Sequence, residues 1–202
     1  MKNAIWIAAI VVLVGVAGTA VFERVTGGGA SAEGEISQLS AGHLQAKIDA
    51  VKKAKDIDSE RRLEQVEVSG TELESYVMFF LRDDIPVQMD SIDVQLTPGA
   101  VAADAQLTFN PRGTGNAVVD ALLAGTHNLF VKGRLSGENR EGKFDLEEIR
   151  VDGIPVPKTL VETLVNKYVK PKYPEVDLKA PFELPWRIDR ITIEQGKATI
   201  VY

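Results

Sequence analysis

Apolar and polar residues follow two different periods along this chain, and the two periods predict a mixture of helices and strands. Apolar residues recur at helical spacing over 40–55, 72–81 and 156–170. In the second segment the spacing is i, i+3, i+4, i+7 and i+8, which places these side chains on one face of a helix. Ser69 and Glu72 have the S-x-x-E spacing of a capping box, which predicts the start of that helix.

The third helical segment is bounded by prolines. Pro157 suits the first turn of a helix, and Pro171 predicts its end. A shorter helix is predicted over 115–124, with Gly125 as its end signal. The segments 72–81 and 156–170 carry bulky apolar stripes, and we therefore expect both to pack on a sheet.

Alternation of apolar and polar residues predicts the strands of that sheet. A short strand is predicted over 63–68, and hairpins over 92–109, 128–151 and 186–202. This period of two is typical of antiparallel strands that bury one face. The turns of the three hairpins are predicted at 98–99, 137–142 and 195–196. We expect an antiparallel sheet of about six strands.

Two of these strands change phase partway along. The apolar positions switch from even to odd residue numbers within 143–151 and again within 186–193. A β-bulge near Glu147-Glu148 and another near Asp189-Arg190 would keep these residues on one face and would bend the strands. The alternative is that each strand passes from an edge into the core. Bulged strands favour an α+β fold with a curved antiparallel sheet and the helix over 157–169 against its concave face.

An uncharged apolar run precedes all of these elements. It extends over 19 residues from Ala4 to Phe22. A helix of this length spans roughly 28 Å, about the hydrocarbon thickness of a bilayer. We predict that residues 1–24 form an uncleaved single-pass anchor, with a cleaved signal peptide as the alternative. Lys2 favours an amino terminus in the cytoplasm, which places the rest of the chain outside.

The chain after the run divides into a linker and one domain. Residues 25–35 read VTGGGASAEGE, a composition typical of a flexible tether. Residues 36–202 are of a suitable length for one folded domain.

The charged and reactive residues give little indication of chemistry. The chain has 29 acidic and 23 basic residues, a net charge of −6 and no cysteine. This balance argues against a nucleic-acid partner, which would require a clustered basic face. Its two histidines, His43 and His127, lie far apart in the sequence. No catalytic motif is present, and we predict no catalytic residue, no metal site, no cofactor and no enzymatic activity.

The order of these segments resembles that of a known family. The residues that carry the resemblance are G-I-P-V-P at 153–157 and the closing hairpin from Ile188 to Ile200. Over residues 60–202 the chain resembles small bacterial membrane-anchored proteins with a TULIP-like (tubular lipid-binding) fold. The resemblance implies a curved sheet wrapped around one or two amphipathic helices, with an apolar groove that binds acyl chains or phospholipid.

Two functions are consistent with these observations. The first is non-enzymatic binding of a lipid or another hydrophobic ligand at the outer face of a bacterial cytoplasmic membrane, on the periplasmic or extracellular side. The second is a structural or scaffolding domain of the cell envelope, with a self-filled core, that recruits a protein partner. Both use the same apolar stripes. The predicted ligand-lining residues are Leu73, Tyr76, Val77, Phe80, Leu160, Leu164 and Tyr168.

Overall fold

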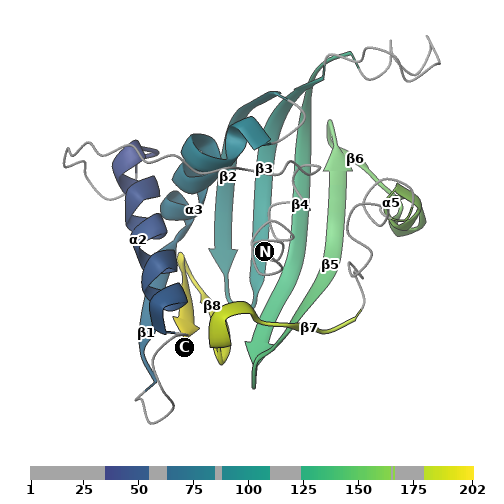
Figure 1. The fold of residues 1–202 in the computed structure, drawn as a ribbon. Coiled ribbons are helices and arrows are strands. Elements are labelled where there is room, and N and C mark those ends of the chain that lie inside the picture. The colour runs from purple at the N-terminus through teal and green to yellow at the C-terminus, as the bar shows by residue number, and fades with distance from the viewer. Residues whose placement is uncertain (1–34, 55–62, 85–87, 110–123, 165, 167–179) are drawn as a thin grey trace.

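The computed structural model describes residues 35–54, 63–84, 88–109, 124–164, 166 and 180–202. These residues form an open antiparallel sheet with a few helices, which confirms the α+β class (Figure 1). Within them the sheet has nine strands in the order β1-β9-β8-β4-β3-β2, with β5 paired to β4 and the short β6 and β7 paired to β5.

The strands are β1 (Gln65–Ser69), β2 (Gln88–Thr97), β3 (Ala100–Phe109), β4 (Gly125–Glu138), β5 (Glu141–Val151), β6 (Ile154–Pro155), β7 (Phe182–Glu183), β8 (Arg190–Glu194) and β9 (Lys197–Val201). The helices are α2 (Gln38–Ala54), α3 (Gly70–Tyr76) and α5 (Lys158–Leu164), with a π-helical turn η1 (Val77–Leu81) and 3₁₀ turns η2 (Arg82–Asp84) and η4 (Pro185–Arg187).

The three long helical segments predicted from the sequence are present in part or in whole. The first is α2, the second is α3 continued by η1, and the third is described over α5. Residues 165 and 167–170 of the third segment lie outside the described residues, as do residues 115–123 of the predicted short helix. Gly125, the predicted end signal of that helix, has a φ of 113° and is the first residue of β4.

The predicted capping box starts α3. The Ser69 side chain accepts a hydrogen bond from the Glu72 N–H at 3.1 Å, and the Glu72 carboxylate accepts one from the Ser69 N–H at 2.9 Å. Lys47 in α2 donates to the same carboxylate at 2.6 Å. Glu72 therefore both begins α3 and joins it to α2.

Ser69→Ala should lower the free energy of unfolding by about 1 kcal/mol, because it leaves a helix N–H without its acceptor. Urea unfolding of the full chain, followed by circular dichroism, measures this change. An unchanged midpoint would mean that the cap adds nothing beyond the packing of α3.

The predicted bulge in β5 is confirmed. The pairing with β4 passes from Lys132–Glu148 to Gly133–Leu146, so Glu147 is an extra residue. The bulge places Glu147 beside Arg134, where the two side chains form an ion pair at 2.7 Å. The apolar residues on either side of the bulge therefore stay on one face of the sheet despite their change of parity.

The second predicted bulge, near Asp189-Arg190, is confirmed. The Asp189 N–H donates to the Val201 carbonyl at 2.8 Å, and Arg190 pairs with the same Val201, so two residues oppose one. Strand β8 begins at Arg190, and its described residues pair with β9 in one continuous register. The residues before it belong to η4, where Trp186 and Arg187 have φ values of 53° and 64°. A bulge that the sequence did not predict occurs in β2, between Met89 and Ser91.

Glycines 137 and 142 were predicted as turn residues but lie in the strands. The turn consists of Asn139 and Arg140, with φ values of 53° and 67°. Gly137 and Gly142 pair directly with each other. A Cβ atom on Gly142 would lie 2.5 Å from the Phe182 ring, so this glycine allows β7 to cross the hairpin closely.

Gly142→Ala should lower the free energy of unfolding by about 1–3 kcal/mol, because its methyl group would displace the Phe182 ring. Gly42→Ala is the matched control. In the described part of the chain no atom would lie within 4 Å of a Cβ at Gly42, which is in α2. That control should stabilise the protein by roughly 0.5–1 kcal/mol, and destabilisation by both changes would contradict the close crossing.

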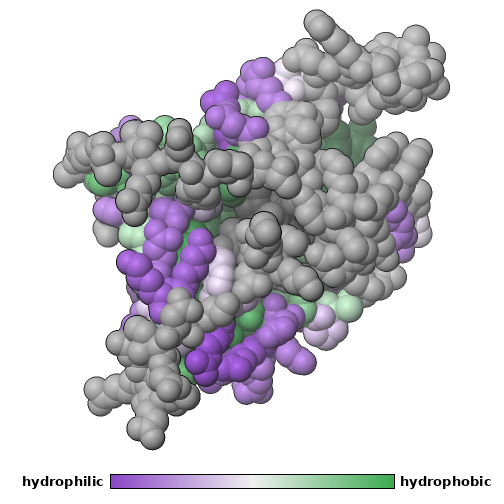
Figure 2. Space-filling view, viewed as in Figure 1, coloured by the Kyte–Doolittle hydropathy of each residue, from purple (hydrophilic) through white to green (hydrophobic). Residues whose placement is uncertain are grey.

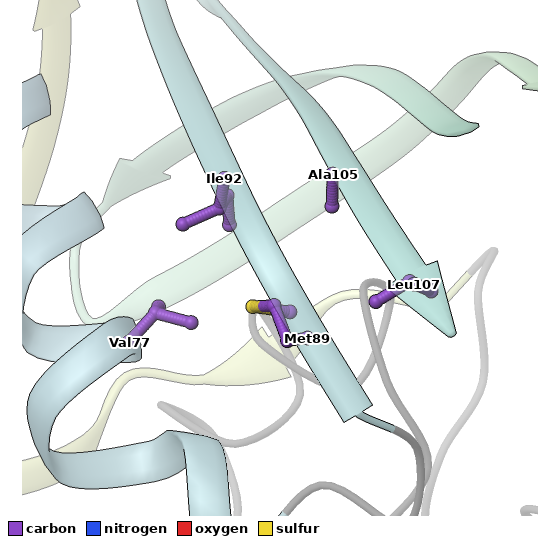
Figure 3. Close-up of a cluster of buried hydrophobic side chains, with 5 residues drawn as sticks. All are labelled: Val77, Met89, Ile92, Ala105 and Leu107. Carbon is purple, nitrogen blue, oxygen red and sulfur yellow. The ribbon is translucent and has the colours of Figure 1, made fainter. Parts of the chain in front are cut away.

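The helices α2 and α3 lie toward β1 and β2, whereas α5 lies beside β5 and β6, at the opposite edge of the sheet (Figure 1). The outer surface of α2 is hydrophilic (Figure 2). Beneath η1, five buried side chains form a core cluster between the turn and strands β2 and β3 (Figure 3). They are Val77, Met89, Ile92, Ala105 and Leu107.

Strand β2 is an edge strand, and α3 covers part of its edge. The Glu74 carboxylate accepts a hydrogen bond from the Val94 N–H at 2.7 Å. Burial raises the pKa of the Glu74 carboxyl above its ordinary value of 4.5; the Val94 N–H opposes this shift and the Asp93 carboxylate adds to it. Ionised Glu74 thus protects the edge of the sheet but destabilises the fold.

Glu74→Gln should stabilise the protein at neutral pH, because the amide oxygen can still accept from Val94 and carries no charge. The folded-state pKa is raised, so the wild type loses stability as the pH rises from about 4.5 through that pKa. The difference between variant and wild type should therefore vanish below about pH 4.5. Parallel pH profiles of the unfolding midpoint would contradict this account.

Candidate ligand-binding face

One row of apolar residues crosses five strands of the sheet. The pairing registers join Ile92 to Ala105, Ala105 to Leu129, Leu129 to Val151, and Val151 to Ile154. Residues directly opposite each other in antiparallel strands project to the same face. The five residues therefore form a continuous apolar row from β2 to β6, which we call the cross-strand row.

The cover over the cross-strand row decreases from β2 to β6. Ile92 and Ala105 are 4% and 1% exposed, because they belong to the cluster beneath η1 (Figure 3). Leu129 is half-buried and packs against that cluster. Val151 is 36% exposed and Ile154 is 70% exposed. The row thus begins in the closed core and ends at an open apolar edge.

Helix α5 adds a pocket at this edge. The pocket has a volume of about 130 Å³ and is lined by Leu146, Glu147, Glu148, Ile149, Pro155, Val156, Lys158 and Val161. Ligand pockets are usually larger, on the order of 300–1,000 Å³. No residue of the cross-strand row lines this pocket, but Ile149 projects to the same face of β5 as Val151, so the pocket lies next to the open end of the row. Lys158 is the cation among its lining residues.

The carboxylates of this pocket are paired with cations on the polar face of the sheet. Glu147 pairs with Arg134, and Glu148 lies 3.3 Å from the Arg150 Nε. Arg150 also lies over the Phe130 ring, at 4.2 Å from its centre. These ion pairs hold the two carboxylates on the polar face of the sheet. Leu146 and Ile149 project to the opposite, apolar face.

Four of the predicted lining residues lie together on α3 and η1. Leu73 is half-buried between two core clusters, and Val77, the first residue of η1, is buried in the cluster with Met89 and Ile92. Tyr76 is buried and donates its hydroxyl hydrogen to Gln45 at 3.1 Å. Burial raises the pKa of the Tyr76 phenol, and Asp49 raises it further. Phe80 is 37% exposed and packs edge-on against Tyr76.

The other predicted lining residues belong to the third helical segment. Leu160 is 48% exposed on α5, which lies beside β6, whereas α3 lies beside β2 at the opposite end of this row of strands (Figure 1). Leu164 ends α5 but its side chain is outside the description, and Tyr168 lies outside the described residues. The structure therefore does not bring Leu160 together with Tyr76 and Phe80. The predicted lining residues whose side chains the structure describes do not line the pocket beside α5.

Sequence reasoning missed Leu129, Val151 and Ile154 as lining candidates. The signal that could have found them is Asp152-Gly153, since Asp-Gly between apolar residues is a strong hairpin signal. Both residues have positive φ values, 51° and 77°. This tight turn pairs Ile154 with Val151 and so extends the apolar row by one strand.

The opposite face of the same strands is polar. It carries the Lys132, Arg134 and Glu147 side chains, which form ion pairs. His127 pairs with Leu107 and therefore lies on the apolar face. Its Nδ1 lies 2.7 Å from the Asp152 carboxylate, and this hydrogen bond lowers the pKa of Asp152. Within the described ranges, no three histidine, aspartate or glutamate side chains come together as a metal site. The cross-strand row is therefore the feature on which a binding site can be built.

No helix among the described residues is long and apolar enough to cross a membrane. The apolar run over 4–22 lies outside those residues. Comparison of the chain with protein-family models, curated proteins and solved structures found no match.

Proposed function

We propose that this domain binds an acyl chain or a lipid on the open part of the cross-strand row, without catalysing a reaction. The observation that carries the proposal is the gradual loss of cover along one continuous apolar row, from 1% exposure at Ala105 to 70% at Ile154. Single exposed apolar residues are ordinary on protein surfaces. Here, however, they continue a buried row and lie beside a pocket.

An acyl chain suits this surface on physical grounds. Each methylene group that leaves water contributes roughly 0.8 kcal/mol. A chain laid along Leu129, Val151 and Ile154 would remove both its own surface and theirs from water. Leu160 on α5 and the pocket beside it would extend the contact. The polar face offers no such surface, since its side chains are mainly charged or amide groups.

The apolar run over 4–22 supports a lipid as the ligand. A chain held beside a membrane has acyl chains as its most abundant apolar neighbours. We propose that residues 1–24 anchor the protein in a bacterial cytoplasmic membrane, with the domain on the periplasmic or extracellular side. The TULIP-like arrangement, in which a curved sheet wraps around helices and a groove, is part of the same proposal.

The alternative is an envelope scaffold with a self-filled core. The cluster beneath η1 supports it, because Val77 fills the apolar face over β2 and β3. Figure 3 shows this side chain directed toward Met89. A self-filled core accounts for the first half of the row but not for its exposed end.

Photolabelling of the full chain in lipid nanodiscs tests the proposal. A fatty acid with a photoreactive group in its acyl chain is added, activated by light, and mapped by mass spectrometry of peptides. We expect labelled residues within β4, β5, β6 and α5. Labelling restricted to the apolar run at 4–22 would contradict ligand binding and favour the scaffold.

A further inference from the structure

The turn that follows α3 exposes two aromatic rings. Val77, Met78 and Leu81 of η1 pack on the core cluster. Phe79 and Phe80 between them are 49% and 37% exposed. π-Helical turns are rare and frequently occur at functional sites. Because the turn is anchored by its inward-facing residues, the two rings are held at the surface in a fixed place.

The amino-terminal side of the domain begins next to this turn. The Ser37 N–H donates to the Ser75 hydroxyl at 3.1 Å, and Ser75 is fully buried. Ser75 lies in the last turn of α3, and Tyr76 alone separates it from η1; α2 contacts η1 as well. Ile36, which precedes this contact, is 41% exposed. The tether therefore reaches the domain at the end that carries Phe79 and Phe80.

We propose that Ile36, Phe79 and Phe80, here called the aromatic end, dock on the lipid surface in which the chain is anchored. The proposal rests on the membrane location proposed above, and it assigns the docking surface to a part of the domain that is separate from the ligand-binding face. The tether over 25–35 has a root-mean-square reach of roughly 18 Å, so the aromatic end is kept close to the bilayer.

The charges beside the aromatic end indicate how it binds. Arg82 and Asp83 follow η1 and are both exposed, so the described side chains that come directly after the rings carry one positive and one negative charge. Docking then depends on insertion of apolar side chains at the interface rather than on attraction to anionic head groups. It should be nearly independent of salt and of the lipid charge.

The aromatic end is also connected, through the core cluster, to the ligand-binding face. The turn η1 packs against Met89 and Leu107, at the end of the sheet where β2 begins and β3 ends. Leu129, in the middle of the cross-strand row, packs against the same cluster. Docking through η1 would thus hold the row near the bilayer, where an acyl chain can leave the membrane and reach it.

Single-cysteine labelling of the full chain tests the docking, since the chain contains no cysteine of its own. Phe79→Cys carries an environment-sensitive fluorophore in nanodiscs, and Asn139→Cys carries it in the β4–β5 turn at the other end of the sheet. A quencher attached to the lipid tails should reduce the emission at position 79 several-fold more than at position 139. A water-soluble quencher should give the reverse order.

Equal quenching at the two positions would overturn the docking. Protection of position 79 from both quenchers would also overturn it, because another part of the protein would then cover this position. A second comparison uses two variants that both carry the fluorophore at Ile36→Cys. One of them has Phe79 intact, and the other also has Phe79→Ser. Loss of lipid quenching on Phe79→Ser is expected, and unchanged quenching would overturn the role of the ring. Photolabelling of β4–β6 is a separate readout, so docking and ligand binding can fail independently.

Discussion

Val151→Asp should reduce photolabelling of β4 and β6 by the acyl-chain probe by about tenfold or more, because a carboxylate placed under an apolar ligand loses its water. Val151 is 36% exposed without a ligand, so the free domain can hydrate the new charge and remain folded. The comparison is made in nanodiscs of identical lipid content.

Ser136→Asp is the matched control for this change. It adds the same charge to the neighbouring strand β4, at an exposed position that pairs with Lys143 on the polar face. Labelling in this variant should equal that of the wild type. Equal losses in both variants would mean that net charge, and not the cross-strand row, governs the labelling.

Met89→Ala should lower the free energy of unfolding by about 2–5 kcal/mol, since it leaves a cavity in a closed cluster. Met89 has no exposed surface and packs with Val77, Ile92 and Leu107. This would be a large fraction of the roughly 5–15 kcal/mol by which folded proteins are stable. Urea unfolding of the full chain measures it.

Gln88→Ala, at the exposed neighbouring position, serves as the control for Met89→Ala. It should change stability by no more than about 0.5 kcal/mol. A small effect of Met89→Ala would mean that the cluster relaxes around the cavity and that η1 is not fixed by it. The aromatic end would then lose its rigid support.

Local patterns predicted the elements whose physics is local. The capping box of Ser69 and Glu72 fixed the start of α3, and the change of parity in β5 identified the bulge at Glu147. Both depend on residues a few positions apart. The turn at Asn139-Arg140 lies within the predicted range, but that range was too wide because Gly137 and Gly142 resemble turn residues. Both glycines lie in strands, where they allow close contact with residues 182–191. That contact is distant in sequence and leaves no local pattern.

The candidate site could be predicted only in part for the same reason. An apolar stripe on α3 shows that Tyr76 and Val77 face the interior, but not whether a ligand or Met89 meets them there. The exposed end of the cross-strand row depends on strand order, which places β6 at the margin of the sheet. Leu129, Val151 and Ile154 come together through pairing registers that no single segment reveals.

Lipid analysis of the released domain tests the central claim most directly. A protease site placed within the tether at Gly27–Gly29 allows the domain to be cut from the full chain after purification from native membranes, and the membrane fragment is then removed. We predict that the released domain retains about one acyl-chain ligand per molecule, and that Val151→Asp removes it. A wild-type domain that contains no lipid, while remaining folded, would contradict binding on the cross-strand row.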